Sequence, residues 1–114
     1  MSKALLYSIL IFIITQAAVW FQTNGQFVWE WCKNNPLILS LAGVPISLGY
    51  IYASKYAFEA FDSMLWPGRL MGFGLGIISF TILTNYYMSE GITPKVIVSL
   101  ILATALVCIQ AFWK

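Results

Sequence analysis

The side chains best able to do chemistry are four charged residues around the end of one apolar segment. They are Lys55, Glu59, Asp62 and Arg69. If one helix carries positions 55, 59 and 62, these share a face, because neighbours on a helix surface are three and four residues apart. Two cations and two anions cancel, which predicts an ion-pair network at the membrane surface. The alternative is a gate or a ligand site at the mouth of the protein.

Enzymatic chemistry finds little support elsewhere in the chain. There is no histidine, so no Ser–His or Cys–His pair can form. We see no phosphate-binding glycine loop, no carboxylate pair deep in an apolar segment and no metal-ligand spacing. Cys32 and Cys108 are expected to be free thiols, because they fall far apart in the topology below. We therefore expect no enzyme, no cofactor and no metal.

The composition indicates a membrane protein. Of 114 residues, 61% are hydrophobic and 9% are charged, against about 25% charged residues in soluble domains. The lipid bilayer is therefore the first expected partner. The net charge of +2 is too small to predict a nucleic-acid partner.

Four apolar segments are long enough to cross a bilayer, which takes about 20 residues of helix. They must be helical, because lipid cannot satisfy free backbone groups and four strands cannot close a barrel. The first run exceeds a signal-peptide core of about 7–15 residues, so we expect a retained span. The prediction is an all-α membrane protein with one domain, residues 1–114, and an antiparallel bundle of transmembrane helices at about 4–22, 36–56, 67–88 and 94–113.

Local signals mark the ends of these spans. Pro36 and Pro94 are favourable first residues of a helix, Thr93 is a good cap, and Pro45 predicts a kink. Tryptophan prefers the headgroup level. All five tryptophans lie at span ends or in connections, namely Trp20, Trp29, Trp31, Trp66 and Trp113.

Lysine and arginine predict the orientation. An even number of spans puts both termini on one side, and positive residues gather on the cytoplasmic side. The terminal side carries Lys3, Lys55, Arg69 and Lys114, and the opposite side carries Lys33 and Lys95. We therefore predict cytoplasmic termini in a membrane of the bacterial inner-membrane type.

Small residues line one face of several spans. In the second span this face holds Ser40, Gly43, Ser47, Tyr50 and Ser54. It predicts either a packing seam or the polar wall of a cavity. Gly68, Gly72 and Gly76 in the third span, with Ser99 and Ala103 in the fourth, predict tight helix packing. The alternative for the glycines is a flexible point in a moving helix.

The second half of the chain resembles the small multidrug resistance branch of the drug/metabolite transporter superfamily. Trp66 and the run Gly72-Phe73-Gly74-Leu75-Gly76 are similar to its aromatic, glycine-kinked third helix. The run Tyr87-Met88-Ser89-Glu90-Gly91-Ile92-Thr93-Pro94 resembles its short link into a dimerising fourth helix. The resemblance implies a homodimer that transports a small molecule by alternating access. The residues expected to line its cavity are Gln16, Trp20, Ser47, Tyr50 and Trp66.

The first half departs from that family at one residue. The family places a glutamate in the middle of its first helix, whereas this chain has Gln16, which cannot ionise. Transport is therefore expected to be uncoupled from protons, or coupled through Glu59 or Asp62. Aromatic rings could hold a cationic substrate without a carboxylate.

Two other functions fit the same four spans. One is a non-transporting accessory subunit of a membrane complex, which would co-purify with a different chain. The other is a holin-like pore-forming protein, which would form large oligomers and kill the cell when overexpressed.

The topology yields the first prediction. Cysteines added at the two ends of the chain should both react with a membrane-impermeant reagent from the cytoplasmic side, because four spans return the chain to its starting side. Labelling of the two ends from opposite sides would exclude an even number of spans.

Overall fold

The computed structural model describes residues 2–113, and these residues form a bundle of helices. The long elements are α1 (Lys3–Asn24), α4 (Gly43–Ala60), α5 (Trp66–Met88) and α6 (Pro94–Phe112). The short elements between α1 and α4 are η1 (Gly25–Phe27), α2 (Glu30–Asn34) and α3 (Pro36–Leu41). Within residues 2–113, four stretches are long and apolar enough to cross a membrane, which confirms the predicted helical fold class.

Large apolar side chains cover the outside of this bundle. Ile14 on α1, Leu37 on α3 and Leu102 on α6 are all more than half exposed. A soluble protein rarely leaves such a surface uncovered, whereas a bilayer covers it. The chain is therefore a multi-pass membrane protein.

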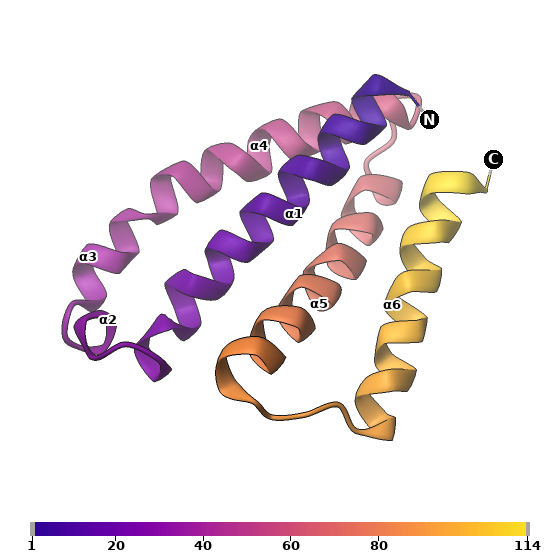
Figure 1. Cartoon of the computed structure of the whole chain (residues 1–114). Coiled ribbons are helices and arrows are strands. Elements are labelled where there is room, and N and C mark those ends of the chain that lie inside the picture. The colour runs from indigo at the N-terminus through magenta and orange to yellow at the C-terminus, as the bar shows by residue number, and fades with distance from the viewer. Residues whose placement is uncertain (1, 114) are drawn as a thin grey trace.

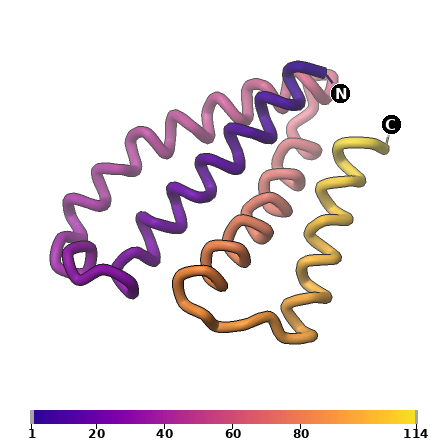
Figure 2. Tube along the Cα trace, in the orientation of Figure 1, coloured from indigo at the N-terminus to yellow at the C-terminus, as the bar shows by residue number. Residues whose placement is uncertain are grey.

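The helices lie in the spatial order α4, α1, α5 and α6 (Figure 1). Helix α1 packs against both α4 and α5, and α6 packs against α5. The tube in Figure 2 shows that α1 and α5 run in one direction and α4 and α6 in the other. The start of α1 and the end of α6 lie at the same end of the bundle, as an even number of spans requires.

Helix α1 approaches α4 along a face of small residues. Gly49, Ala53 and Ala57 recur every four residues on α4. Gly49 lies against the side chain of Thr15, where a β-carbon would clash. The Ser8 hydroxyl donates a hydrogen bond of 2.9 Å to the carbonyl of Ala53, which is 0% exposed. This seam lies on a different face of α4 from the one that the pattern of serines predicted.

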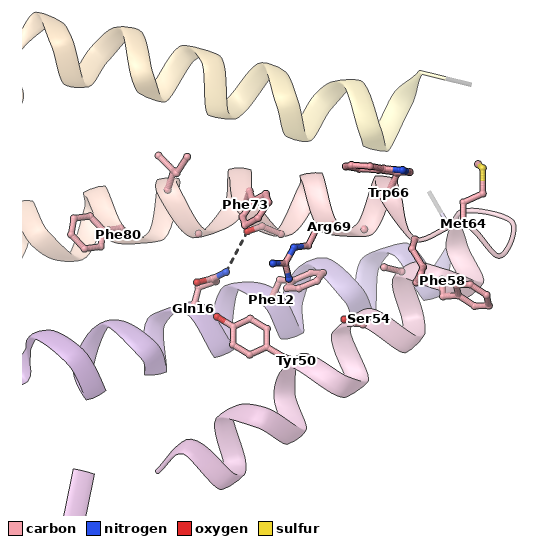
Figure 3. Close-up of a pocket in the computed structure, with 16 residues that line it drawn as sticks. Phe12, Gln16, Tyr50, Ser54, Phe58, Met64, Trp66, Arg69, Phe73 and Phe80 are labelled. Atoms are coloured by element: carbon pink, nitrogen blue, oxygen red, sulfur yellow. Dashed lines mark hydrogen bonds between the residues drawn. The ribbon is translucent and has the colours of Figure 1, made fainter. Parts of the chain in front are cut away.

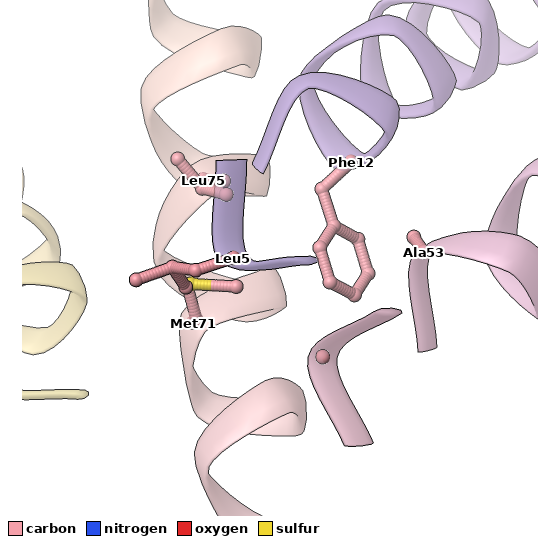
Figure 4. Close-up of a cluster of buried hydrophobic side chains, with 6 residues drawn as sticks. Leu5, Phe12, Ala53, Met71 and Leu75 are labelled. Atoms are coloured by element: carbon pink, nitrogen blue, oxygen red, sulfur yellow. The ribbon is translucent and has the colours of Figure 1, made fainter. Parts of the chain in front are cut away.

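The core sits where α1, α4 and α5 meet. Its buried members come from all three helices and are Leu5, Phe12, Ala53, Ala57, Met71 and Leu75 (Figure 4). Small residues on α4 let the larger side chains of α1 and α5 fill the junction. The core therefore fixes α4 and α5 on either side of α1.

The glycine stripe of α5 packs within the chain. A β-carbon added at Gly68 would lie 2.8 Å from that of Ala57, and one at Gly72 would lie 3.1 Å from the ring of Phe12. Gly74 faces α6, where an added β-carbon would lie 2.9 Å from the carbonyl oxygen of Ala103. The glycines thus hold α5 against three other helices of the same chain.

The second span begins at Pro36 as predicted but differs from its prediction in the position of its interruption and at its C-terminal end. The helix is interrupted at Ala42, between α3 and α4, rather than at Pro45 itself. Pro45 has no N–H to donate to the carbonyl four residues earlier, so the ladder fails in the turn before it. At the other end α4 continues to Ala60, and Asp62 has a left-handed φ of 55°. The expectation that Asp62 shares a helical face with Lys55 and Glu59 is wrong, because the helix ends first.

The connection between α5 and α6 follows its local sequence. Ser89 and Gly91 take positive φ angles of 53° and 81° after α5. The Thr93 hydroxyl accepts a hydrogen bond of 3.3 Å from the Val96 N–H, and Pro94 opens α6 as predicted. Cys32 and Cys108 are both free thiols, also as predicted.

The α5–α6 contact yields the second prediction. Ala103→Leu should destabilise the folded chain, because Ala103 is 3% exposed and faces Gly74, and overpacking costs about 1–3 kcal/mol. The measurement is the fraction of detergent-purified protein that stays monodisperse after heating. Ala105→Leu, at an exposed position two residues away, is the matched control. Equal heat resistance of the two variants would contradict this packing.

Candidate functional site

A large groove opens between α4 and α5, with α1 at its base (Figure 3). Its volume is about 1060 Å³. Helix α1 contributes Phe12 and Gln16 to the lining. Helix α4, the connection after it, and α5 supply the rest: Tyr50, Ser54, Ala57, Phe58, Met64, Leu65, Trp66, Gly68, Arg69, Gly72, Phe73, Gly76, Ile77 and Phe80.

The groove exists because α4 and α5 meet closely at one end and diverge beyond it. The close contact is between Ala57 and Gly68, next to the connection that joins the two helices. Further along, α1 lies between α4 and α5 and contacts both. Glycines at positions 72 and 76 let α5 approach the Phe12 and Gln16 side chains of α1, which form the base of the groove.

Gln16 forms part of the base of the groove and ties α1 to α5. Its side-chain Nε2 donates a hydrogen bond of 3.3 Å to the carbonyl oxygen of Gly72 (Figure 3). A β-carbon added at Gly76 would lie 2.9 Å from the same nitrogen. The amide is half-buried, so it both links the two helices and presents a polar group to the groove.

Arg69 places a positive charge in the groove. Its guanidinium carbon lies 4.7 Å from the centroid of the Phe73 ring, one turn further along α5. Among the described lining residues, Arg69 is the only one with a formal charge. A guanidinium presents several N–H donors in one plane and suits a carboxylate or phosphate. The groove therefore has a cationic end and an otherwise largely apolar wall.

The other members of the charged cluster lie outside the groove. The Nζ atom of Lys55 lies 5.8 Å from the ring centroid of Tyr56 on the same helix. Lys55, Glu59 and Asp62 are exposed and are absent from the lining. Lys55 and Arg69 each lie close to an aromatic ring, and the predicted ion-pair network with Glu59 and Asp62 stays a prediction.

Three of the residues expected to line a cavity do so. Gln16, Tyr50 and Trp66 come together in the groove from α1, α4 and α5. The ring centroids of Tyr50 and Phe12 are 6.5 Å apart, which places the tyrosine over the base. Ser47 lies instead in a separate shallow depression with Ser40 and Gly43.

Trp20 lies in a different environment from the one predicted. It is only 2% exposed, and its indole Nε1 donates a hydrogen bond of 2.9 Å to the Thr84 hydroxyl of α5. Its ring stacks on Tyr87 with centroids 5.4 Å apart. The expectation that Trp20 lines the cavity is wrong, because its indole packs between helices and bonds to Thr84, and it is not part of the groove lining.

The apolar wall that α5 contributes to the groove was not predicted from the sequence. Phe73, Ile77 and Phe80 follow Arg69 at spacings of four, four and three residues, so all four share one face of the helix. This periodicity was the available signal. The glycines between these positions indicated packing instead.

The fold defines a multi-pass membrane protein of four spanning helices with a lateral groove. Comparisons of the chain with protein-family models, curated proteins and solved structures gave no match. The groove itself is therefore the basis for a proposed function, and the resemblance to small multidrug resistance transporters stays a prediction.

The contrast between the buried Trp20 and the exposed Trp66 yields the third prediction. Trp20→Phe should lower thermal stability, because it removes a buried hydrogen bond with a net contribution of about 0.5–1.5 kcal/mol. Trp66→Phe should leave stability nearly unchanged, because Trp66 is 75% exposed. Thermal unfolding of both variants in the same detergent provides the measurement. Similar losses at both positions would contradict the buried role of Trp20.

Proposed function

We propose that the chain is a small-molecule transporter of drug/metabolite-transporter type, that it acts as a homodimer, and that the groove is its substrate site. The observation that carries this proposal is the groove between α4 and α5, about 1060 Å³ in volume. Small-molecule sites are typically concave, about 300–1,000 Å³, apolar and aromatic, with a few polar groups that set orientation. The groove matches this description in size and in lining.

A second copy would complete a site that one copy leaves open. Ligand sites bury about 70–90% of a ligand's surface, whereas α4 and α5 leave this groove without a cover on one side. Helix α6 packs on α5, and Ala103 is its one buried residue among those described. The face of α6 that points away from α5 carries exposed residues such as Leu102 and can contact lipid or a partner copy, in keeping with the dimer that the family resemblance implies.

The charge of the groove favours a neutral or anionic substrate. The Arg69 guanidinium would repel a cation that bound beside it, and it already lies over the Phe73 ring. The polar groups of Gln16, Tyr50 and Ser54 can donate hydrogen bonds but carry no charge at neutral pH. This modifies the expectation that aromatic rings hold a cationic substrate.

Cysteine accessibility provides the fourth prediction and needs no known substrate. In a background with Cys32→Ser and Cys108→Ser, Ser54→Cys should react with a membrane-impermeant maleimide from either side of a proteoliposome. Alternating access exposes one site to each side in turn, whereas a static site opens to one side only. Leu48→Cys, on the same helix but outside the groove, is the control and should stay largely unlabelled from both sides.

The outcomes separate the candidate functions. Reaction of Ser54→Cys from one side only, or from neither, would contradict alternating access and favour an accessory subunit. Light scattering of the purified protein should give the mass of two chains, whereas a large heterogeneous oligomer would favour a holin-like pore.

A further inference from the structure

Arg69 lies at the end of the groove that is nearest to the membrane surface. Arg69 lies three residues after the start of α5 at Trp66, or about 4.5 Å along the helix axis. Trp66 is exposed at the very end of the span, where tryptophan prefers the headgroup level. The Arg69 side chain is thus within reach of the level at which lipid headgroups carry their charge.

The apolar part of the groove runs from there toward the bilayer centre. From Arg69 to Phe80 is eleven residues, or about 16 Å of helix. Half of the hydrocarbon thickness of a bilayer is about 15 Å. Phe73, Ile77 and Phe80 therefore line the depth of one leaflet below the arginine, and all three are exposed.

The groove is also open in the direction from which lipid would enter. It lies between α4 and α5, whose outward surfaces carry apolar side chains such as Ile51 and Ile82. These helices contact lipid along the length of the span, so the groove communicates with the bilayer itself. A ligand with an acyl chain can enter sideways without leaving the apolar phase.

We propose that the groove binds an anionic lipid from the leaflet on the side of the chain termini, with the headgroup at Arg69 and an acyl chain along Phe73, Ile77 and Phe80. This inference rests on the proposed function and deepens it by naming its substrate class. The charge is complementary: the lining offers one guanidinium, and Glu59 and Asp62 are not part of it. The Ser54 and Tyr50 hydroxyls lie across the groove on α4, where they can hydrogen-bond headgroup oxygens.

The test uses two lipids with identical acyl chains. Native mass spectrometry of the purified full chain should show dioleoyl phosphatidylglycerol bound about five- to tenfold more tightly than dioleoyl phosphatidylcholine, because both carry a phosphate but only phosphatidylcholine also carries a quaternary ammonium, which the Arg69 guanidinium repels. Arg69→Gln should remove this preference, and Arg69→Lys should retain part of it. Lys55→Gln makes the same change of charge near the same end of the bundle, outside the groove, and should keep the preference.

A second pair of variants tests the acyl-chain wall. Ile77→Trp should fill the groove and weaken binding of both lipids. Ile82→Trp on the same helix makes the same change outside the groove and should bind as the unaltered chain does. Both positions are exposed, so neither substitution overpacks the core.

Several outcomes would overturn the inference. They are equal binding of the two lipids, an equal effect of Lys55→Gln and Arg69→Gln, or an equal effect of the two tryptophan variants. Displacement of phosphatidylglycerol by inorganic phosphate alone would indicate a free-anion site instead of a lipid site.

The lipid inference and the transport proposal can fail separately. Phosphatidylglycerol preference with one-sided labelling of Ser54→Cys would leave a lipid-binding membrane protein that does not transport. Two-sided labelling without lipid preference would leave a transporter with a different substrate.

Discussion

The close approach of α1 to its two neighbours is the constraint on which the rest of the structure depends. Between helices in lipid there is little hydrophobic driving force, so association relies on van der Waals contact and hydrogen bonds across small residues. Gly49 and Ala53 bring α4 onto α1, where Ser8 bonds to the Ala53 carbonyl. Gly72 brings α5 onto α1 from the other side, where Gln16 bonds to the Gly72 carbonyl. These contacts set α4 and α5 apart from each other and so create the groove.

Gln16 and Arg69 determine how polar groups are distributed along the groove. Hydrogen-bonding groups inside a bilayer must be satisfied by protein, and Gln16 is satisfied by a backbone carbonyl that only a glycine-rich helix exposes so closely. Arg69 escapes the same demand because it lies near the end of α5, where its guanidinium can reach the headgroup level. Polarity is therefore graded along the groove, from a charge at one end to aromatic rings toward the bilayer centre.

The sequence predicted the spans well and the contacts between them less well. Apolar length determines a span almost alone, so the four helices and the Thr93–Pro94 start of α6 follow from the residues. The face of α4 that packs against α1 could not be predicted from the sequence. Ser47 and Ser54 on one face and Gly49 and Ala53 on the other are all small enough to allow close approach, so residue size did not distinguish the two faces. Trp20 was wrongly expected to line the cavity, because its partner, Thr84, lies far away in the chain and no local pattern reveals such a pairing.

The position of α1 between α4 and α5 also has a consequence for biogenesis. The ribosome synthesises α1 before either of the two helices that pack against it, α4 and α5. Ser8 and Thr15 can meanwhile hydrogen-bond to the preceding turn of their own helix. The longer amide of Gln16 has to wait for the Gly72 carbonyl, whose helix is synthesised third of the four spans. The helix that packs between α4 and α5 in the finished protein is thus the one that stays longest without its partners during synthesis.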